Sequence, residues 1–433
     1  MKSHILSLLE KLLKILARLT LKRYKPGIIG ITGNVGKTSA KEAIRVVLER
    51  ERRVRSASKN FNNEIGLPLT ILGDWQDAGG IFFWVRVVAG AVWNLVQKNP
   101  SYPELLILEY GIDHPGDMKR LLEIARPNIG VVTPIGEIPV HVEFFAGREG
   151  LIREKTRLVK DLPATGFAIL NADNEASRNM KGETRAHAIT YGWSESADIR
   201  IRSMETRMDA TPPCITCKLE YNGSFVPVRI EEAVGRVHAY AAAAGAAVGI
   251  SFGINLVKIS ENLSYYKSPP GRLKIIEGRE GSRIIDDTYN SSPLAFEEAL
   301  DTMRGIKARR KIAVLGDMLE LGRHSIEAHE NAGKMVAGEV KILITVGARA
   351  KFIAEAARNA GLSEKSIIVS KTVGEAGAAL KKILRPGDLV LIKGSQGVRM
   401  ERIVYEVMAN PDKAKKLLVR QEERWLEKPG LYD

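Results

Sequence analysis

Short apolar runs alternate with amphipathic stretches along most of the chain. The clearest pair is a strand-like run at residues 27–32 followed, after a glycine-rich turn, by a helical pattern over 41–53. Two more apolar runs, at 105–108 and 129–132, flank a helical stretch over 117–125. This alternation predicts an α/β protein in which helices cover both faces of a parallel sheet.

The pattern changes between about residues 185 and 232, where short alternating runs predict a small β-rich subdomain or insertion. An alanine-rich helix is expected over 237–248, and the turn cluster 268–271 is the best candidate for a domain boundary. Strand–helix alternation then resumes, with strand-like runs at 311–315, 342–346, 366–369 and 389–392. The chain is therefore predicted to hold a central α/β domain over 27–268 and a Rossmann-like C-terminal domain over 269–433.

The first 26 residues differ from the rest, because they contain seven Lys or Arg residues against one acid, Glu10. Basic residues three or four apart form one helical stripe: Lys11, Lys14, Arg18, Lys22 and Lys25. Apolar residues are expected on the other side: Ile5, Leu8, Leu9, Leu12, Leu13, Leu16 and Leu19. This basic amphipathic helix over 1–26 either lies on an anionic membrane or docks on the protein's own body.

A second apolar stretch, residues 81–96, is rich in phenylalanine, tryptophan and valine and is interrupted by Arg86. It is shorter than the roughly 20 residues that a membrane-spanning helix needs. The stretch is either a buried helix or a surface that faces a membrane together with residues 1–25. No small-residue cleavage site follows the N-terminal apolar stretch, so we expect a cytoplasmic protein, peripheral at the inner face of the membrane if these segments bind it.

The composition of the 433 residues, 45% hydrophobic and 27% charged, is that of an ordinary globular protein. Lys and Arg exceed Asp and Glu by 65 to 51, giving a formal charge of +14 and implying an anionic partner. No RNA- or DNA-binding motif accompanies the charge, so a nucleic acid is not expected. Cys214 and Cys217 form a lone CxxC inside a strand-like run, which lacks the further ligands of a zinc site.

The glycine-rich turn reads Thr32-Gly33-Asn34-Val35-Gly36-Lys37-Thr38-Ser39 and lies between a strand and a helix. Glycines allow backbone N–H groups to approach phosphate oxygens, and the helix N-terminus favours negative charge. Lys37 is expected to reach the β- and γ-phosphates and Thr38 to bind Mg²⁺. Ile31 occupies the first glycine position of the strict phosphate-loop pattern, yet the context still predicts nucleotide binding by residues 33–39.

This loop and the segment 58–70, Ser-Lys-Asn-Phe-Asn-Asn-Glu-Ile-Gly-Leu-Pro-Leu-Thr, resemble the Mur ligases. The resemblance runs from about residue 27 to about 408 and includes the segment 286–293. The segments 314–322 and 393–401 are most similar to the D-alanyl-D-alanine-adding branch. These enzymes form amide bonds with ATP and build the peptidoglycan stem peptide. The resemblance implies ATP and Mg²⁺ as cofactors. It also implies a peptidoglycan precursor and D-alanyl-D-alanine, or a similar amine, as substrates.

The resemblance also implies roles for individual side chains. With Lys37, it assigns catalysis and metal binding to Glu109, His141 and Lys155, the last as a lysine carbamylated by CO₂. Glu109 also follows a buried strand, where a carboxylate can hold Mg²⁺ near a phosphate loop. Contacts to ATP are expected from Arg272, Asp287, Tyr289 and Asn290. Substrate contacts are expected from Asn62, Asn63, Lys393 and Ser395.

The chain departs from the family pattern in several places. Pro134 replaces an asparagine, and about two extra residues displace His141. Val237, His238 and Ala241 stand where the family carries residues that contact adenine, which leaves nucleotide selectivity open.

Only 26 residues precede the first strand, so the family's uridine-nucleotide-binding domain is expected to be lacking. The acceptor is then the family's UDP-linked peptide, or a lipid-linked or other non-UDP molecule. A nucleotide-binding regulator without ligase activity is the alternative of another class.

Overall fold

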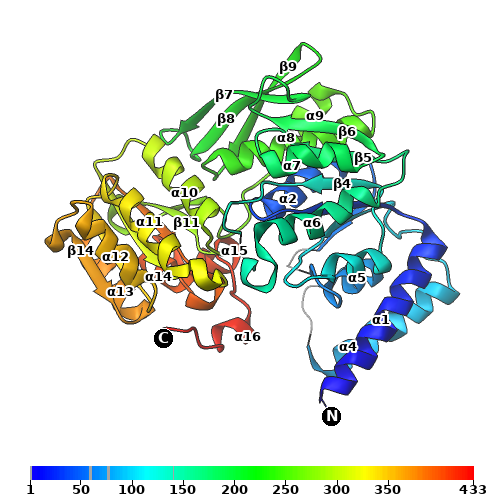
Figure 1. The fold of residues 1–433 in the computed structure, drawn as a ribbon, viewed down its shortest axis with the longest axis horizontal. Coiled ribbons are helices and arrows are strands. Elements are labelled where there is room, and N and C mark those ends of the chain that lie inside the picture. Colours follow the sequence, from blue (N-terminus) through cyan, green and yellow to red (C-terminus); the bar gives the residue numbers. More distant parts are fainter. Residues whose placement is uncertain (1, 58–60, 76–78, 140) are drawn as a thin grey trace.

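The computed structural model describes residues 2–57, 61–75, 79–139 and 141–433, with side chains from residue 7 onward (Figure 1). Ser58, Lys59 and Asn60 of the family-like segment and the side chain of Ile5 therefore lie outside the described residues. Two β-sheets, each covered by helices on both faces, lie side by side (Figure 1). The predicted α/β class with parallel sheets and helices is confirmed.

The central sheet has the strand order β2-β3-β1-β4-β5-β6-β7-β8-β9. Its strands are β1 (Gly27–Thr32), β2 (Val54–Ser56), β3 (Leu105–Glu109), β4 (Ile129–Val132), β5 (Phe167–Asn171), β6 (His187–Gly192), β7 (Ile199–Arg207), β8 (Cys214–Tyr221) and β9 (Ser224–Glu231). Strand β1 pairs in parallel with both β3 and β4. It is apolar throughout because both faces are buried, and its C-terminal end is the centre of the sheet's ligand-binding edge.

Helices cover the two faces of the central sheet in separate hydrophobic clusters. Helices α2 (Lys37–Leu48), α8 (Arg236–Ser251) and α9 (Leu256–Leu263) pack on one face. Helices α5 (Asp117–Ile124), α6 (Gly147–Lys160) and α7 (Glu175–Asn179) pack on the other. Alanines and glycines of α8 allow it to lie close against α2, where Ala43, Ala243 and Ala247 are fully buried.

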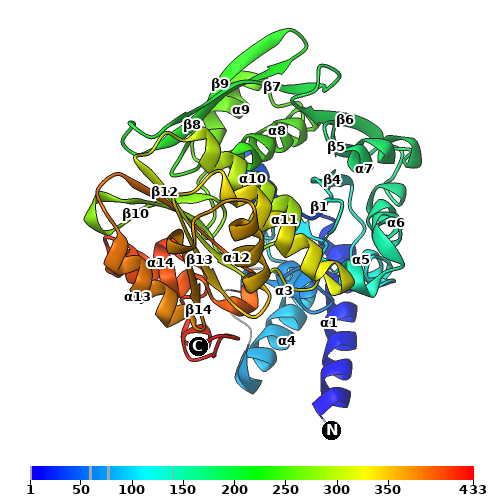
Figure 2. The same ribbon diagram turned by 60° about the vertical axis from the view of Figure 1, so that its left-hand side comes forward.

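The C-terminal sheet has the strand order β10-β11-β15-β12-β13-β14 and is parallel except for β10. Its strands are β10 (Lys274–Glu277), β11 (Arg283–Asp287), β12 (Arg310–Gly316), β13 (Ile342–Val346), β14 (Ile367–Ser370) and β15 (Asp388–Lys393). Its helices are α10 (Pro293–Gly305), α11 (Ser325–Ala337), α12 (Ala350–Asn359), α13 (Val373–Ile383), α14 (Glu401–Val407), α15 (Ala414–Leu417) and α16 (Glu423–Leu426). Figure 2 shows this layer in front of the central sheet.

The β-rich segment 185–232 is part of the central sheet, not a separate subdomain. Strands β6 and β7 pair only at residues 191–192 and 199–200, after which antiparallel β8 and β9 extend the same sheet. The link between the two sheets includes the turn cluster 268–271. The domain limits of 27–268 and 269–433 stay predictions.

Three helices, α1 (Lys2–Tyr24), α3 (Gly66–Leu72) and α4 (Gly80–Val96), form a separate layer at one end of the central domain. The prediction that all leucines of α1 share one side is wrong, because α1 packs against two helices at once. Leu13 and Leu16 are buried against α3 and α4, whereas Leu8, Leu12, Ile15 and Leu19 are exposed. No helix in the described part of the chain is long and apolar enough to cross a membrane.

The close α2–α8 contact predicts the effect of a larger side chain at Gly245. A Cβ atom there would lie 3.2 Å from the backbone of Ala43, so Gly245→Leu should lower the free energy of unfolding by about 1–3 kcal/mol. Gly90→Leu is a matched helical control, because no atom lies within 4 Å of its Cβ position. Urea denaturation followed by circular dichroism measures both, and equal stability of the two variants would contradict tight packing.

Candidate functional site

The turn after β1 forms a closed loop that leads into the N-terminus of α2. Gly33 has φ +135°, and a Cβ atom there would lie 2.1 Å from Thr133 Oγ1, so only glycine fits. The amides of Asn34 and Val35 donate to the Pro134 carbonyl at 3.0 and 3.2 Å. Gly36, at φ +85°, precedes α2 without a capping side chain. The first turn of α2 therefore offers backbone N–H groups for an anion.

Two lysines lie against the inside of this loop. Lys37 Nζ donates to the carbonyls of Gly33 (3.0 Å) and Asn34 (3.3 Å). Lys155, projecting from α6, donates to the same Gly33 carbonyl at 3.0 Å and is buried. Burial lowers the pKa of Lys37 to about 8, although Glu109 opposes this, and burial together with Lys37 holds the pKa of Lys155 well below its usual range. A strong positive potential is thus concentrated at the loop.

Glu109, at the end of β3, is the buried anion of this cluster. Its Oε1 lies 3.0 Å from Lys41 Nζ, and both side chains are almost fully buried. Burial alone would raise the pKa of Glu109, but the charges of Lys41, Lys37 and Arg272 outweigh it and lower the pKa. Glu109 is therefore an ionised carboxylate beside the phosphate loop.

The C-terminal domain contributes Arg272 to the same site. Arg272 Nη2 donates to Thr38 Oγ1 at 3.4 Å, and its guanidinium carbon lies 3.8 Å from the centroid of the Tyr289 ring. The buried Nε of Arg272 has no hydrogen-bond partner within the described ranges. This cation therefore links the two domains at the loop and retains a donor for a further group.

Asp287 and Lys393 form a buried ion pair that supports this arrangement. Lys393 Nζ donates to Asp287 Oδ2 at 2.6 Å and to the Asn290 carbonyl at 2.9 Å. Asp287 also accepts the backbone N–H of Leu273 at 3.2 Å, next to Arg272. The two side chains therefore position the segments that carry Arg272 and Tyr289, and contacts of Asp287 and Asn290 with ATP stay predictions.

The predicted substrate ligands use most of their polar groups inside the protein. Ser395 Oγ accepts the Leu319 amide at 2.9 Å and donates to the Ser291 carbonyl at 3.4 Å. Asn63 Oδ1 accepts the amide of Gly66 at 2.9 Å, at the start of α3. Contact of Ser395, Lys393 and Asn63 with substrate stays a prediction.

Asn62 lies directly over the segment that follows Glu109. Its carbonyl accepts the Gly111 amide at 2.9 Å, and a Cβ atom at Gly111 would lie 2.5 Å from Asn62 Nδ2. Asn62 thus lies at the edge of the cluster, and its predicted contact with substrate is untested.

His141 lies between two carboxylates that the sequence did not single out as ligands. Its Nε2 is 3.2 Å from Asp113 Oδ1, its Nδ1 is 3.4 Å from Glu320 Oε2, and its amide donates to the Glu320 carbonyl. Burial lowers the pKa of His141, although Asp113 opposes this, so the imidazole tends to be neutral. Asp113 follows Glu109 by four residues, which was the available sequence signal.

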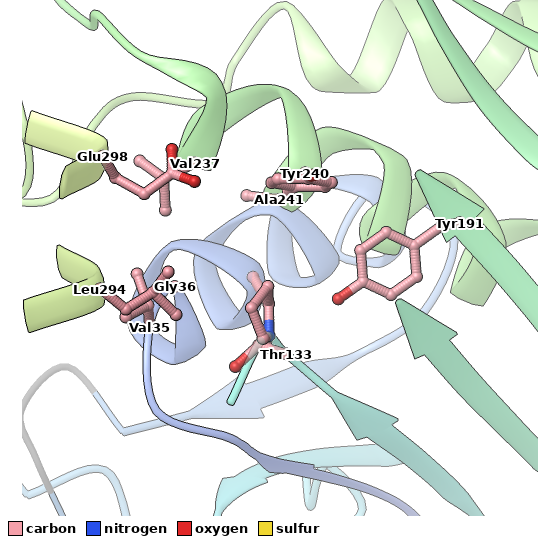
Figure 3. Close-up of a pocket in the computed structure, with 11 residues that line it drawn as sticks. Val35, Gly36, Thr133, Tyr191, Val237, Tyr240, Ala241, Leu294 and Glu298 are labelled. Atoms are coloured by element: carbon pink, nitrogen blue, oxygen red, sulfur yellow. The ribbon is translucent and has the colours of Figure 1, made fainter. Parts of the chain in front are cut away.

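A narrow pocket opens beside the phosphate loop (Figure 3). Its lining comes from both domains and is mostly apolar: Val35, Gly36, Ala40, Thr133, Pro134, Tyr191, Val237, Tyr240, Ala241, Leu294 and Glu298. Figure 3 shows Val237, Ala241 and the Tyr240 ring along one side. A planar apolar-faced group such as a nucleobase fits this lining better than a charged one.

His238 lies outside this pocket. Its Nδ1 is 2.8 Å from Tyr266 Oη and its Nε2 is 2.8 Å from the Arg272 carbonyl. Complete burial lowers its pKa to about 4, so the ring is neutral and fixes the segment that carries Arg272. Of the three unusual positions, Val237 and Ala241 therefore face the apolar pocket and His238 does not.

Within the described ranges, no cluster of three or more His, Cys, Asp or Glu side chains is arranged to hold a metal ion. Thr38 and Glu109 nevertheless offer hard oxygen donors beside the loop, and Mg²⁺ commonly takes only one or two protein ligands together with phosphate oxygens and water. These two residues therefore fit a Mg²⁺ that arrives with a nucleotide.

Two family profiles match the chain: the Mur ligase middle domain over residues 92–249 and the Mur ligase, glutamate ligase domain over 271–396. The UDP-N-acetylmuramoyl-tripeptide–D-alanyl-D-alanine ligase of Mycobacterium leprae is 30% identical over 398 residues, covering 86% of this chain and 71% of that protein. The chain belongs to the Mur ligase family. The enzyme of that name from Bacillus subtilis is 29% identical over 92% of this Mur ligase and 79% of its own length.

A solved structure agrees with this assignment. MurF ligase from Thermotoga maritima, in complex with ADP, superimposes with a TM-score of 0.76 and 26% identity over 94% of this Mur ligase and 84% of that chain. Mur ligases are ATP-dependent amide-forming enzymes, so the prediction of such a ligase is confirmed. The roles of single residues stay predictions.

Lys37 allows a direct test of the phosphate loop. Replacing Lys37 with Met removes a partly buried cation from the loop, so affinity for ATP should fall about 100-fold or more while the melting temperature is retained. Arg45→Met is the matched control, because Arg45 also lies on α2 but pairs with Glu42 and Glu49 away from the loop. Calorimetric titration measures both variants, and equal affinities would exclude Lys37 as a phosphate ligand.

Proposed function

We propose that this Mur ligase joins D-alanyl-D-alanine, or a similar amine, to the peptide carboxylate of a peptidoglycan precursor. The observation that carries the proposal is the convergence of Lys37, Lys155 and Arg272 on the phosphate loop, beside the carboxylate of Glu109. These side chains come from both domains. The relatives named above, which match most of the chain, carry that activity in their names.

The reaction proceeds in two steps. The acceptor carboxylate attacks the γ-phosphorus of ATP, and the bond to the β,γ-bridging oxygen breaks to give an acyl phosphate and ADP. The amine then attacks the acyl carbon, loses a proton and expels inorganic phosphate. Lys37 and Arg272 neutralise charge on the transferring group, and the α2 N-terminus orients it. Packing of the C-terminal domain against the loop excludes water, which would hydrolyse the acyl phosphate.

Mg²⁺ belongs to this proposal. Thr38 and Glu109 would hold it beside the phosphates, and His141 with a modified Lys155 would serve a second ion. When bound, the ion supplies positive charge that stabilises phosphoryl transfer. Asp113, which follows Glu109 on the same segment, is one of the two carboxylates that face His141, so we add it to the candidate ligands.

Modification of Lys155 by CO₂ is supported by its surroundings. Only a neutral amine attacks CO₂, and burial beside Lys37 favours the neutral form. The carbamate has the opposite charge and would face the Lys37 ammonium across the Gly33 carbonyl that both amines now contact. The neutral amine beside Lys37 would thereby become an anion that attracts the Lys37 ammonium.

The ATP base would occupy the apolar pocket beside Val237 and Ala241. Contacts there come from aliphatic side chains and the Tyr240 ring, whose hydroxyl donates to Asp173 at 2.8 Å. Shape and stacking therefore dominate over amide hydrogen bonds, so discrimination among purine nucleotides should be modest.

For the acceptor, the names of the relatives favour a UDP-linked tripeptide. A lipid-linked or other non-UDP acceptor is the alternative, and peripheral contact of residues 1–25 and 81–96 with the inner face of the membrane accompanies it. The enzyme would then act from the cytoplasm.

Phosphate release tests the proposed activity. We expect ATP turnover to rise at least about tenfold when D-alanyl-D-alanine and an acceptor tripeptide are both present, because the acyl phosphate forms only on the acceptor. UDP-linked and lipid-linked acceptors should be compared, and mass spectrometry should detect the new amide. If no pair of carboxylate and amine substrates raises ATP turnover, a nucleotide-binding regulator without ligase activity would describe the protein better.

Lys155 provides a second test, through chemical rescue. Lys155→Ala should lower turnover about 100-fold or more, and acetate or formate should restore part of it by replacing the carbamate. Lys160→Ala is the control, because Lys160 also lies on α6 but pairs with Glu183 on the surface. If Lys155→Ala keeps normal turnover, the carbamate has no role.

A further inference from the structure

We propose that α1 and α4 form a docking surface for an anionic lipid bilayer, on which the enzyme lies peripherally. The two helices, called here the docking pair, are Lys2–Tyr24 and Gly80–Val96. They project side by side from one end of the central domain, and Figures 1 and 2 show this from two directions. Ten of the nineteen large hydrophobic side chains exposed in the described part of the chain lie on these two helices.

Helix α4 exposes a largely apolar face, on which the exposed Arg86 also lies. Its exposed large side chains recur at helical spacing: Ile81, Phe82, Val85, Val92, Trp93 and Val96. Phe82 is 87% exposed and Trp93 64%. A soluble monomer rarely leaves a patch of this size uncovered, so the face requires a partner. Helix α4 has only 17 residues, which is too short for a bilayer span but suitable for a helix lying at its surface.

Helix α1 exposes apolar and basic side chains on the same face. The apolar group is Leu8, Leu12, Ile15 and Leu19, and the basic group is Lys11, Arg18, Lys22 and Arg23. Glu10, the only acid of this helix, is half-buried. Long basic side chains can lie along an apolar surface while their charges reach lipid phosphates. Lys14 points elsewhere, since it pairs with Glu123 of α5 at 2.6 Å.

The docking pair is held firmly against the body. Leu13 and Leu16 pack with Val87 and Ala91 between the helices. At their C-terminal ends, Tyr24 Oη donates to the Asn94 carbonyl at 2.8 Å. The same hydroxyl accepts the Asn99 amide at 2.8 Å, and the Tyr24 ring stacks on Tyr102. The exposed face is therefore a preformed surface.

The basic side chains of α1 indicate which partner covers the exposed face of the docking pair. In a symmetric dimer the same patch would meet itself and bring the basic side chains of α1 together, which like-charge repulsion opposes. An anionic bilayer instead offers phosphates to the cations and hydrocarbon to Phe82 and Trp93, and aromatic rings favour this interface. A bilayer therefore satisfies both the apolar and the basic groups at once.

The docking pair also lies next to Asn62, one of the residues predicted to contact substrate. Phe61 and Ile65 pack against the cluster between the helices, and they flank Asn62, which contacts Gly111 beside Glu109. A lipid-linked acceptor held in the bilayer would thus approach the site from the end of the central domain that carries α1 and α4. This step rests on the proposed function, whereas vesicle binding does not.

Vesicle co-sedimentation of the full chain tests the surface. Vesicles of phosphatidylcholine mixed with phosphatidylglycerol should bind the protein, and phosphatidylcholine alone should bind about tenfold or more weakly. Phe82→Glu with Trp93→Glu, and separately Lys11→Glu with Arg18→Glu, should each lower the partition coefficient at least about tenfold. Val257→Glu with Ile326→Glu, two exposed apolar residues on α9 and α11, is the matched control and should bind normally.

Three results would overturn the proposal. The first is that the wild-type protein does not bind anionic vesicles. The second is that the control variant loses vesicle binding as strongly as the docking-pair variants. The third is that the wild-type protein is a dimer in sedimentation equilibrium, and the docking-pair variants are monomers that still bind vesicles normally. Phosphate release with D-alanyl-D-alanine is measured on the same samples, with a UDP-linked and with a lipid-linked acceptor. Vesicle binding without turnover would overturn the proposed reaction alone, and turnover without vesicle binding would overturn the docking surface alone.

Discussion

An excess of buried positive charge around one carboxylate is the constraint on which the site depends. Lys37, Lys155 and Arg272 approach the loop from α2, α6 and the C-terminal domain, while Glu109 is already paired with Lys41. Backbone carbonyls of the loop partly satisfy the amines, but burial still depresses the pKa of both Lys37 and Lys155. A triphosphate supplies the missing negative charge, so its binding and the approach of the Arg272 segment should favour each other.

Residues that are neighbours in sequence were predictable, and residues brought together by packing were not. The strand, loop and helix over residues 27–48 follow from a short apolar run, glycines and an amphipathic pattern, although α2 begins at Lys37, before the predicted start. His141, by contrast, meets Asp113 and Glu320 from two other segments, one of them in the C-terminal domain. No local pattern encodes that meeting, because it depends on how the two sheets lie against each other.

The same reasoning explains why the unusual residues of α8 have different consequences. Val237 and Ala241 lie one turn apart and face the pocket, so their side chains set the shape of its wall. His238 points into the protein and bonds to the Arg272 carbonyl. A substitution at His238 should thus act on the segment of Arg272 and not on the pocket, because one helix carries both the pocket wall and the support of Arg272.

The net charge of +14 divides into two groups that differ in their surroundings. Cations at the phosphate loop are buried, so salt screens them little and they respond to a multivalent anion of fixed geometry. Those on α1 are exposed, where salt at physiological strength screens charges beyond about 8 Å and single ion pairs contribute little. Such charges become effective only when apolar contact holds them at an interface, and the exposed leucines between them supply that contact. The mixture of leucine and lysine on one face, which the sequence pattern alone had separated onto two, is therefore what a bilayer-binding helix requires.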